Sequence, residues 1–366
     1  MSSILEKQQF LLNFIVILLN SHYTYTMAKK KKITLMDIAE NLNVSTVTVS
    51  KALANKDGVG DELRKKIKEM AVTMGYVMPS ANTAGTHMKD GTGNIGILIP
   101  SRFFSNNSSF YWNLYNALSS ELLKQNYYCI MEQLNSEDEV NLIVPHMVQD
   151  KKIDGIIILG QVSNNYARFF STCYKNFIFL DFYLSDENID TITSDNFYSE
   201  YIMTDYLISL GHKDIRFVGS FNATTSIKDR FMGFMKAMLE NNYHVSFDEI
   251  IEDRDENGLS IPIELPEKLP TAFVCNCDET AVHVINAIKQ RGLNVPDDVS
   301  VAGFDNYVSI NGTSPALTTV NVDPSVTAQA AVELIIKKIN GLPYNHGHTV
   351  ISGKIVIRES VRKISQ

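Results

Sequence analysis

Cysteine is scarce in this chain of 366 residues, which holds four cysteines. They are Cys129, Cys173, Cys275 and Cys277. Small secreted domains use dense cysteine frameworks, and a structural zinc site needs four ligands that usually come in closely spaced pairs. Only Cys275 and Cys277 lie close together, and no second pair accompanies them. The cysteines therefore predict free buried thiols rather than disulfides or a metal site.

Long apolar runs are missing too. A membrane-spanning helix needs about 18 or more consecutive apolar residues, whereas the run from Phe10 to Leu19 is shorter and is interrupted by Asn13. The sequence therefore predicts no transmembrane helix and no membrane partner. Hydrophobic residues still make up 45% of the chain and aromatic residues 10%, which excludes disorder over most of its length. At about 150 residues per domain, two or three compact units are expected.

Three common catalytic motifs are absent as well. The chain contains no phosphate-binding G-x-x-x-x-G-K-[ST] loop, no G-x-S-x-G nucleophile elbow and no H-E-x-x-H zinc motif. These absences favour a protein that is not an enzyme and uses no cofactor.

The net charge of −8 hides two regions of opposite sign. Residues 27–90 carry a net +4, whereas residues 91–366 carry −12. A small basic segment on a larger acidic body is typical of a chain whose first part binds nucleic acid. Chance unevenness is the other explanation.

A second methionine, Met27, follows the first 26 residues and directly precedes the basic run 29–32. Residues 1–26 lack the basic start and the small-residue cleavage site of a signal peptide. We therefore expect Met27 to be the natural start and residues 1–26 to be a non-native extension. A genuine N-terminal helix is the alternative, and the mass of the native N-terminal peptide distinguishes the two.

Three short helices are expected between residues 33 and 76. Their expected ranges are Leu35 to about Leu42, Thr46 to about Ala54 and about Asp61 to Met74. Thr34 caps the first helix, and Ser45 caps the second. Asn43 can adopt the left-handed backbone that the turn between them needs. With the small Ala39 at the helix contact, this pattern predicts a helix-turn-helix.

The second of these helices is the expected DNA-reading element, because the start of that helix enters the major groove in a helix-turn-helix. The methyl groups of Thr46 and Val47 suit thymine methyl groups, and Lys51 can donate to a guanine edge. The lysine run 29–32 suits phosphates. The candidate DNA-binding residues here are Thr34, Ser45, Thr46, Val47, Ser50, Lys51 and Asn55. A packing module without a DNA role is the alternative.

Two stretches of this region resemble the signature of the lactose-repressor (LacI/GalR) family. They are Ile33-Thr-Leu-Met-Asp-Ile-Ala-Glu40 and Val44-Ser45-x-x-Thr48-Val49-Ser50-Lys51. The resemblance covers residues 33 to about 360. It implies an α/β chain with a three-helix helix-turn-helix DNA-binding domain and a periplasmic-binding-protein-like core of two doubly wound parallel-sheet lobes. Asn43 stands where a turn glycine is usual, and Lys51 where the family often has arginine.

Residues 77–93 are rich in glycine, threonine, serine and asparagine, which is typical of a linker. The resemblance implies that this stretch forms a short hinge helix on DNA and wedges an apolar side chain into the minor groove. Met88 is the candidate for that wedge. Gly85 weakens such a helix by about 1 kcal/mol relative to alanine.

Residues 94–366 alternate short apolar runs with helical stretches, which predicts right-handed βαβ units and doubly wound sheets. The expected strands are 94–100, 154–160, 177–182, 215–220, 272–276 and 299–304. The expected helices include 110–125, 198–210, 229–241 and 279–291. Ligands of such sheets bind beyond the carboxyl ends of the strands.

Polar and aromatic residues follow several of these strands. Carboxylates and a guanidinium with aromatic neighbours suit a polyhydroxylated ring, whereas helix capping and core packing are the alternatives for each single residue. The candidate effector-binding residues are Ser101, Phe104, Trp112, Asp181, Arg230, Cys277, Asp278 and Asp305. The family resemblance implies that Arg230 and Asp305 contact the effector, and that Asp181 and Cys277 occupy pocket positions.

The resemblance also implies that the chain crosses three times between the lobes. The expected divisions are 27–76 for the DNA-binding domain, 77–93 for the hinge linker and 94–366 for the effector-binding and dimerisation core. Within the core, lobe 1 is expected at about 94–192 plus 323–352 and lobe 2 at about 193–320 plus 353–366.

By this resemblance the chain is expected to be a cytoplasmic transcriptional regulator, most often a repressor, that binds a pseudo-palindromic operator as a homodimer. A small sugar or sugar derivative in the cleft would control DNA affinity through a coupling free energy of about 1–3 kcal/mol. The lack of an added heptad helix after the core favours a dimer over a tetramer, and a phosphocarrier-protein corepressor stays open. The alternatives are a solute-binding receptor of transport and a sugar-processing enzyme that uses carboxylates such as Asp181 and Asp305.

Overall fold

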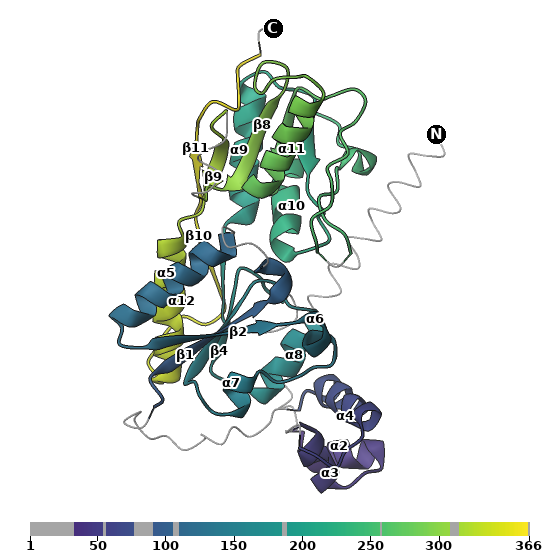
Figure 1. Ribbon diagram of the computed structural model, residues 1–366, viewed down its shortest axis with the longest axis vertical. Coiled ribbons are helices and arrows are strands. Elements are labelled where there is room, and N and C mark those ends of the chain that lie inside the picture. The colour runs from purple at the N-terminus through teal and green to yellow at the C-terminus, as the bar shows by residue number, and fades with distance from the viewer. Residues whose placement is uncertain are drawn as a thin grey trace.

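The computed structural model describes the chain in seven stretches. They are residues 33–53, 56–76, 91–104, 110–184, 189–256, 258–307 and 315–364. These residues form a small helical headpiece (33–76) at one end of the molecule and two α/β lobes, of which lobe 1 adjoins the headpiece and lobe 2 lies beyond it (Figure 1). The expectations for residues 1–26, Asn55 and Met88 lie outside the described residues and stay predictions.

The headpiece consists of three helices, α2 (Leu35–Leu42), α3 (Thr46–Leu53) and α4 (Asp61–Met74). The predicted caps are confirmed. The Asp37 amide donates to Thr34 Oγ1 at 3.3 Å, the Thr34 amide donates to Asp37 Oδ2 at 2.7 Å, and the Thr48 amide donates to Ser45 Oγ at 3.0 Å. Asn43 has a φ of 51°, as the turn between α2 and α3 requires.

The apolar faces of the three helices close a core of their own. It holds Ile38, Ala39, Val49, Ala52, Leu53, Val59, Ile67, Ala71 and Tyr76. The loop between α3 and α4 is fixed by Arg64, whose Nη2 donates to the carbonyls of Lys56 at 2.8 Å and Val59 at 3.1 Å. The headpiece is therefore a packed unit whose outer face is free to present side chains.

Lobe 1 is built on a parallel sheet of six strands in the order β10-β5-β4-β3-β1-β2. The strands are β1 (Asn94–Pro100), β2 (Tyr128–Leu134), β3 (Gly155–Leu159), β4 (Phe177–Leu180), β5 (Thr191–Ser194) and β10 (His348–Ile351). Successive residues of a strand point to opposite faces, so Ile97 and Ile157 belong to one core cluster while Leu98 and Ile158 belong to another.

Helices cover both faces of this sheet. One face carries α5 (Phe110–Lys124) and α12 (Pro324–Ile339). The other face carries α6 (Ser136–Val140), α7 (His146–Gln149) and α8 (Asn164–Cys173). A single 3-10 turn, η1 (Ser101–Phe103), follows β1.

Lobe 2 is built on a sheet of five strands in the order β11-β9-β8-β7-β6. The strands are β6 (Ile215–Val218), β7 (Ala272–Cys275), β8 (Ser300–Asp305), β9 (Thr318–Asn321) and β11 (Lys354–Val356). β11 pairs with β9 in the antiparallel direction, and the other neighbours are parallel. One face carries α9 (Asn196–Ser209) and α10 (Thr225–Glu240), and the other carries α11 (Asp278–Gln290).

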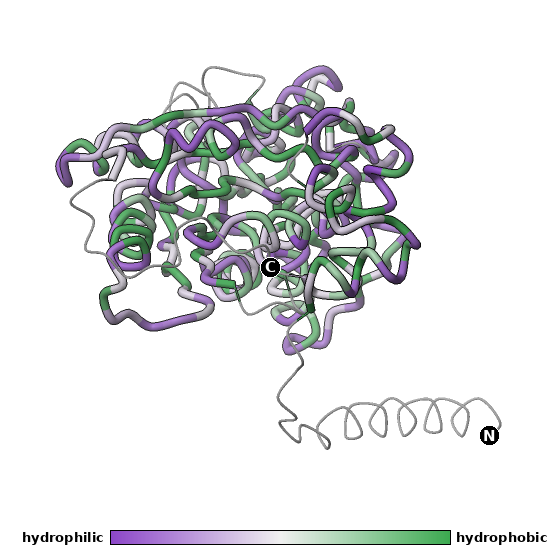
Figure 2. Tube along the Cα trace, turned by 90° about the horizontal axis from the view of Figure 1, so that it is seen from below, coloured by the Kyte–Doolittle hydropathy of each residue, from purple (hydrophilic) through white to green (hydrophobic). Residues whose placement is uncertain are grey.

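The chain crosses between the lobes at three places, after β5, after β9 and after β10 (Figure 1). Each sheet is therefore completed by a strand that arrives late in the sequence. Along the chain trace, hydrophilic segments concentrate at the outer turns, whereas hydrophobic segments run through the interior (Figure 2).

The six strands and four helices expected for the core all occur, with shifted ends. β4 ends at Leu180 and not at Phe182, because Asp181 leaves the strand with a φ of 70°. α10 begins at Thr225, four residues before the expected Asp229, since Thr224 caps it and accepts from the Ile227 amide at 3.2 Å.

Candidate functional site

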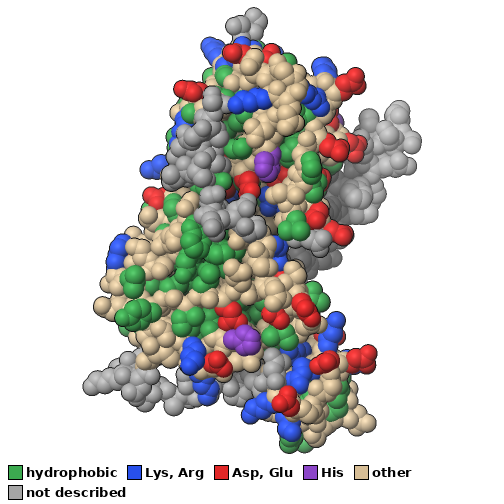
Figure 3. All heavy atoms as spheres, in the orientation of Figure 1, with side chains coloured by type: hydrophobic (Ala, Val, Ile, Leu, Met, Phe, Trp, Pro, Cys, Tyr) green, Lys and Arg blue, Asp and Glu red, His purple; other side chains and the backbone are tan. Residues whose placement is uncertain are grey.

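The first candidate site is the outer face of α3 in the headpiece. Thr46, Val47, Ser50 and Lys51 are all exposed, and Val47 is 61% exposed although it is apolar. The exposed Val47 methyl groups are of the kind that can contact a thymine methyl in the major groove. Lys and Arg side chains gather on the headpiece and on the adjoining edge of lobe 1 (Figure 3). This face has the shape and composition to enter a major groove.

Two of the predicted DNA-binding residues already use their hydroxyl groups inside the headpiece. Thr34 Oγ1 donates to Asp37 Oδ2 at 2.6 Å, and Ser45 Oγ lies 2.8 Å from Thr48 Oγ1. Both side chains are exposed and lie at helix N-termini, where backbone amides suit phosphate oxygens. Both hydroxyl groups are therefore occupied in capping the starts of α2 and α3.

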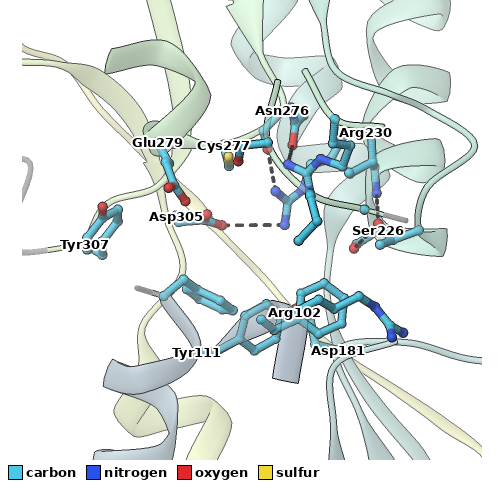
Figure 4. Close-up of a pocket in the computed structure, with 18 of the residues that line it drawn as sticks. Arg102, Tyr111, Asp181, Ser226, Arg230, Asn276, Cys277, Glu279, Asp305 and Tyr307 are labelled. Atoms are coloured by element: carbon cyan, nitrogen blue, oxygen red, sulfur yellow. Dashed lines mark hydrogen bonds and ion pairs between the residues drawn. The ribbon is translucent and has the colours of Figure 1, made fainter. Parts of the chain in front are cut away.

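The second candidate site is a cavity of about 450 Å³ between the two lobes. Its wall is formed by residues from both lobes: Arg102, Phe103, Phe110, Tyr111, Asp181, Thr224, Ser226, Ile227, Arg230, Arg254, Gly258, Leu259, Ser260, Asn276, Cys277, Glu279, His283, Asp305 and Tyr307. Figure 4 shows Arg102, Tyr111 and Asp181 on one side and Arg230, Cys277 and Asp305 on the opposite side. The cavity lies at the carboxyl ends of the strands of both sheets, as predicted.

Arg230 is a buried and well anchored charge in this cavity. Its Nε donates to Asn196 Oδ1 at 2.8 Å, its Nη1 donates to the Asn276 carbonyl, and its Nη2 lies 3.5 Å from Asp305 Oδ1. The guanidinium also lies 3.8 Å from the centre of the Phe304 ring, a favourable position for a cation. The residue is 5% exposed, so its orientation is set before any ligand arrives.

Two aspartates face each other across the cavity from equivalent places in the two sheets. Asp181 directly follows β4, and Asp305 ends β8, with φ angles of 70° and 107°. Asp181 accepts from the Tyr111 hydroxyl at 2.7 Å, whereas Asp305 Oδ1 accepts no hydrogen bond from the described residues. Burial raises the pKa of both carboxyls, and the nearby Arg230 guanidinium opposes that rise. Asp305 Oδ1 therefore lies beside the Arg230 guanidinium as a buried acceptor that receives no hydrogen bond within the described part of the chain.

A second polar cluster fixes the back of the cavity. Asp253 accepts from the Arg254 guanidinium at 2.8 Å, from Asn276 Nδ2 at 2.6 Å and from Thr280 Oγ1 at 2.6 Å. These bonds hold the pKa of Asp253 below its usual range. Cys277 lies beside this cluster, and burial raises the pKa of its thiol to about 12. The thiol therefore stays protonated at neutral pH and is a weak hydrogen-bonding group rather than a nucleophile.

Four predicted effector-binding residues do not lie on the cavity wall. They are Ser101, Phe104, Trp112 and Asp278. The Trp112 ring stacks on Tyr115 at 5.5 Å and meets Phe104 edge-on at 5.0 Å, so these aromatics pack the end of α5. The Ser101 carbonyl closes the η1 turn by accepting from the Phe104 amide at 3.0 Å. Asp278 is 1% exposed and accepts from Thr319 Oγ1 at 2.5 Å, inside lobe 2.

Some residues of the cavity carry no signal in the sequence. Arg254, whose ion-pair partner Asp253 lies behind the wall, is in the irregular segment between η2 (Phe247–Glu249) and β7, which has no motif. Thr224 and Ser226 belong to the first turn of α10, which starts earlier than expected. Among the described residues, no helix is long and apolar enough to cross a membrane, and no three metal-binding side chains come together.

The geometry defines a class of protein: a helix-turn-helix headpiece attached to a two-lobed ligand-binding core. Residues 34–79 match the family model for bacterial regulatory proteins of the lacI family, and residues 204–361 match a periplasmic binding protein-like domain. The chain is 30% identical over 340 residues to the HTH-type transcriptional repressor PurR of Histophilus somni (strain 129Pt), covering 90% of this chain and 99% of the relative. The chain belongs to the LacI family and is a DNA-binding transcriptional regulator.

Other comparisons agree with this assignment. PurR of Glaesserella parasuis is 28% identical over 346 residues, covering 91% of this chain and 99% of the relative. The fold is shared with the lac repressor dimer bound to operator and the anti-inducer ONPF, with a TM-score of 0.61 at 20% identity, covering 91% of this chain and 100% of the other. It is also shared with the CelR-cellobiose complex, with a TM-score of 0.65 at 16% identity, covering 90% and 100%.

Proposed function

We propose that this chain is a repressor that binds a pseudo-palindromic operator as a homodimer, and that an uncharged sugar between the lobes controls its DNA affinity. The observation that carries the effector class is that every guanidinium on the cavity wall already has a carboxylate partner inside the protein. The pairs are Arg102 with Glu139, Arg230 with Asp305 and Arg254 with Asp253. A phosphate or carboxylate on the ligand would have to displace one of these carboxylates or lie against Asp181, so anionic effectors are disfavoured.

The remaining groups of the wall suit hydroxyls and an apolar ring face. Asp305 Oδ1 offers a buried acceptor, and Asp181 offers another next to the Tyr111 hydroxyl. Phe103 and Tyr111 lie with ring centroids 4.8 Å apart on the lobe 1 side. Aromatic faces and fixed carboxylates are the usual partners of a neutral polyhydroxylated ring.

A thermal-shift screen tests the effector class. Neutral mono- and disaccharides, with cellobiose from the CelR complex as a first probe, should raise the melting temperature, since a ligand at 100 times its Kd adds about 2.7 kcal/mol. The corresponding sugar phosphates should give no shift. Asp305→Ala should abolish the shift, whereas Asp248→Ala, an exposed carboxylate of the same lobe, should keep it. A shift by phosphates alone would overturn the assignment to uncharged ligands.

The DNA part is tested by selecting bound duplexes from a random pool with the chain starting at Met27. We expect a palindrome, because a two-fold dimer presents two copies of α3. The Lys51→Ala variant should bind that palindrome about 5- to 150-fold more weakly, as expected for the loss of a base contact worth about 1–3 kcal/mol. Lys66→Ala, an exposed lysine on α4, is the charge-matched control. If both variants lost the same affinity for the palindrome, Lys51 would contribute only its charge and would make no sequence-specific contact with a base.

The dimer is supported by hydrophobic side chains that gather over α5 on the outside of lobe 1 (Figure 3). Contiguous apolar surface of this kind is typical of an interface. We further propose that the chain works in the cytoplasm and acts by binding rather than by catalysis, as expected for a regulator related to transcriptional repressors. Light scattering of the purified chain at micromolar concentration would test the dimer.

A further inference from the structure

The headpiece packs against lobe 1 through one face of α4. The α4 helix packs against α8, and Val72 joins the lobe 1 core cluster. In Figure 1, α4 is the headpiece helix nearest to lobe 1, and α3 lies on the far side. Docking therefore leaves the DNA-reading helix exposed while it sets the direction in which that helix points.

The centre of the contact is a lysine that is 1% exposed, Lys68. Its Nζ donates to the Leu142 carbonyl at 2.8 Å and lies 5.2 Å from the centre of the Phe169 ring. Burial lowers the pKa of this amine to about 8. Burying an ammonium is unfavourable unless a carbonyl or an aromatic face receives it. Positions of α4 that bury Lys68 away from the Leu142 carbonyl and the Phe169 ring are therefore disfavoured.

The Leu142 carbonyl is itself held by the short helix α6. Leu142 has a φ of 55°, and the next amide, that of Ile143, donates to the Asp138 carbonyl at 2.9 Å. On the other side, the Tyr166 hydroxyl of α8 donates to the Ile143 carbonyl at 3.0 Å. The acceptor for Lys68 therefore moves with α6 and its turn.

The α6 helix is tied in turn to the effector cavity. Glu139 on α6 accepts from Arg102 Nη1 at 2.7 Å and from the Ser163 amide at 2.5 Å. Arg102 also lines the cavity and donates to the Gln161 carbonyl. The side chain of Gln161 accepts from the Thr225 amide of lobe 2 at 3.0 Å. A continuous set of polar contacts thus runs from lobe 2, past the cavity wall, to the headpiece.

We propose that Lys68 is a positioning residue that docks the headpiece on lobe 1 in its DNA-reading orientation, and that the Arg102–Glu139 ion pair links this dock to the effector cavity. The proposal rests on the function proposed above. A ligand that changes the position of Arg102, or that rotates lobe 2 against Gln161, moves α6 and with it the acceptor for Lys68. The headpiece then loses its fixed orientation.

The test compares Lys68→Met with Lys66→Met in the full chain. The first substitution keeps the aliphatic length and removes the buried donor; the second removes an exposed lysine from the same helix. We expect Lys68→Met to weaken binding to the selected palindrome by about tenfold and to speed hydrogen exchange of the α4 and 139–143 amides. Lys66→Met should change affinity by at most about twofold and leave the exchange unchanged. Lys68→Arg, which retains a donor, should recover part of the affinity.

The link to the cavity is tested with Glu139→Gln, which keeps the shape and removes the charge that holds Arg102. This variant should also speed exchange in α4, although α4 is not its neighbour in sequence, and combining it with Lys68→Met should add little further loss. Equal affinity and unchanged exchange in Lys68→Met, with a normal melting temperature, would overturn the dock. If even the unaltered chain selects no DNA, the proposed function fails, while the exchange data still decide whether the dock exists.

Discussion

Replacing Gly233 with alanine is expected to destabilise lobe 2 by roughly 3 kcal/mol or more. A Cβ at this position of α10 would lie 2.1 Å from the Phe197 carbonyl oxygen and 2.9 Å from the Tyr201 nitrogen of α9. Both are backbone atoms of a helix, so they cannot rotate away as a side-chain end could. The two helices would have to separate, and the core beneath them would lose contacts. Urea unfolding followed by circular dichroism measures the loss.

The matched control for this change is Gly60→Ala. Gly60 has a φ of −64°, and nothing lies within 4 Å of the Cβ it would gain. Its replacement should change the free energy of unfolding by less than about 1 kcal/mol. If Gly233→Ala were equally mild, the close contact between α9 and α10 would not be needed for the fold.

Replacing Glu200 with glutamine should remove a large part of the pH dependence of stability. Glu200 lies on α9, is 0% exposed, and neither carboxylate oxygen accepts a hydrogen bond from the described residues. Burial raises the pKa of this carboxyl from 4.5 to about 8, although Arg230 opposes the rise. The folded chain therefore binds the Glu200 proton more tightly than the unfolded chain, and stability falls as the pH rises from 4.5 to 8.

Between pH 5 and pH 8 this single group should cost roughly 3 kcal/mol of stability in the unaltered chain, a cost that Glu200→Gln avoids. Unfolding curves at both pH values, taken for both proteins, isolate the contribution. Asp205→Asn, an exposed carboxylate on the same helix, should leave the difference between the two pH values unchanged. If Glu200→Gln lost as much stability between pH 5 and pH 8 as the unaltered chain, a different group would be responsible for the pH dependence.

Much of the fold could be predicted because its main strands are continuous apolar runs. β1, β3, β4, β7 and β8 are buried over nearly their whole length, and buried parallel strands take such sequences. The strands that the pattern did not reveal are of another kind. β2 is half-buried, β10 is largely exposed, and β5 and β9 are four-residue strands rich in threonine. Sheet edges and short polar strands depend on tertiary contacts, which local sequence does not record.

Cavity residues could be predicted from the sequence where the backbone topology alone fixes their position. Asp181 and Asp305 stand at strand ends, so topology brings them to the cavity whatever their neighbours are. Trp112 and Phe104 do not line the cavity, because closeness in sequence to the end of β1 does not determine on which side of α5 a ring lies. Arg254 was missed because an irregular segment has no period, and its position follows from a salt bridge to Asp253.

Because every guanidinium on the cavity wall has a carboxylate partner, the two ligands proposed for this protein, DNA and an uncharged effector, should respond differently to ionic strength. DNA binding releases counterions, so its equilibrium constant falls steeply as salt is added. The uncharged effector proposed above would meet arginines that are already paired with carboxylates, so it would release few counterions and its own affinity should stay nearly constant. If the proposed effector lowers operator affinity, a fixed amount of it would therefore displace more of the operator as the salt concentration rises.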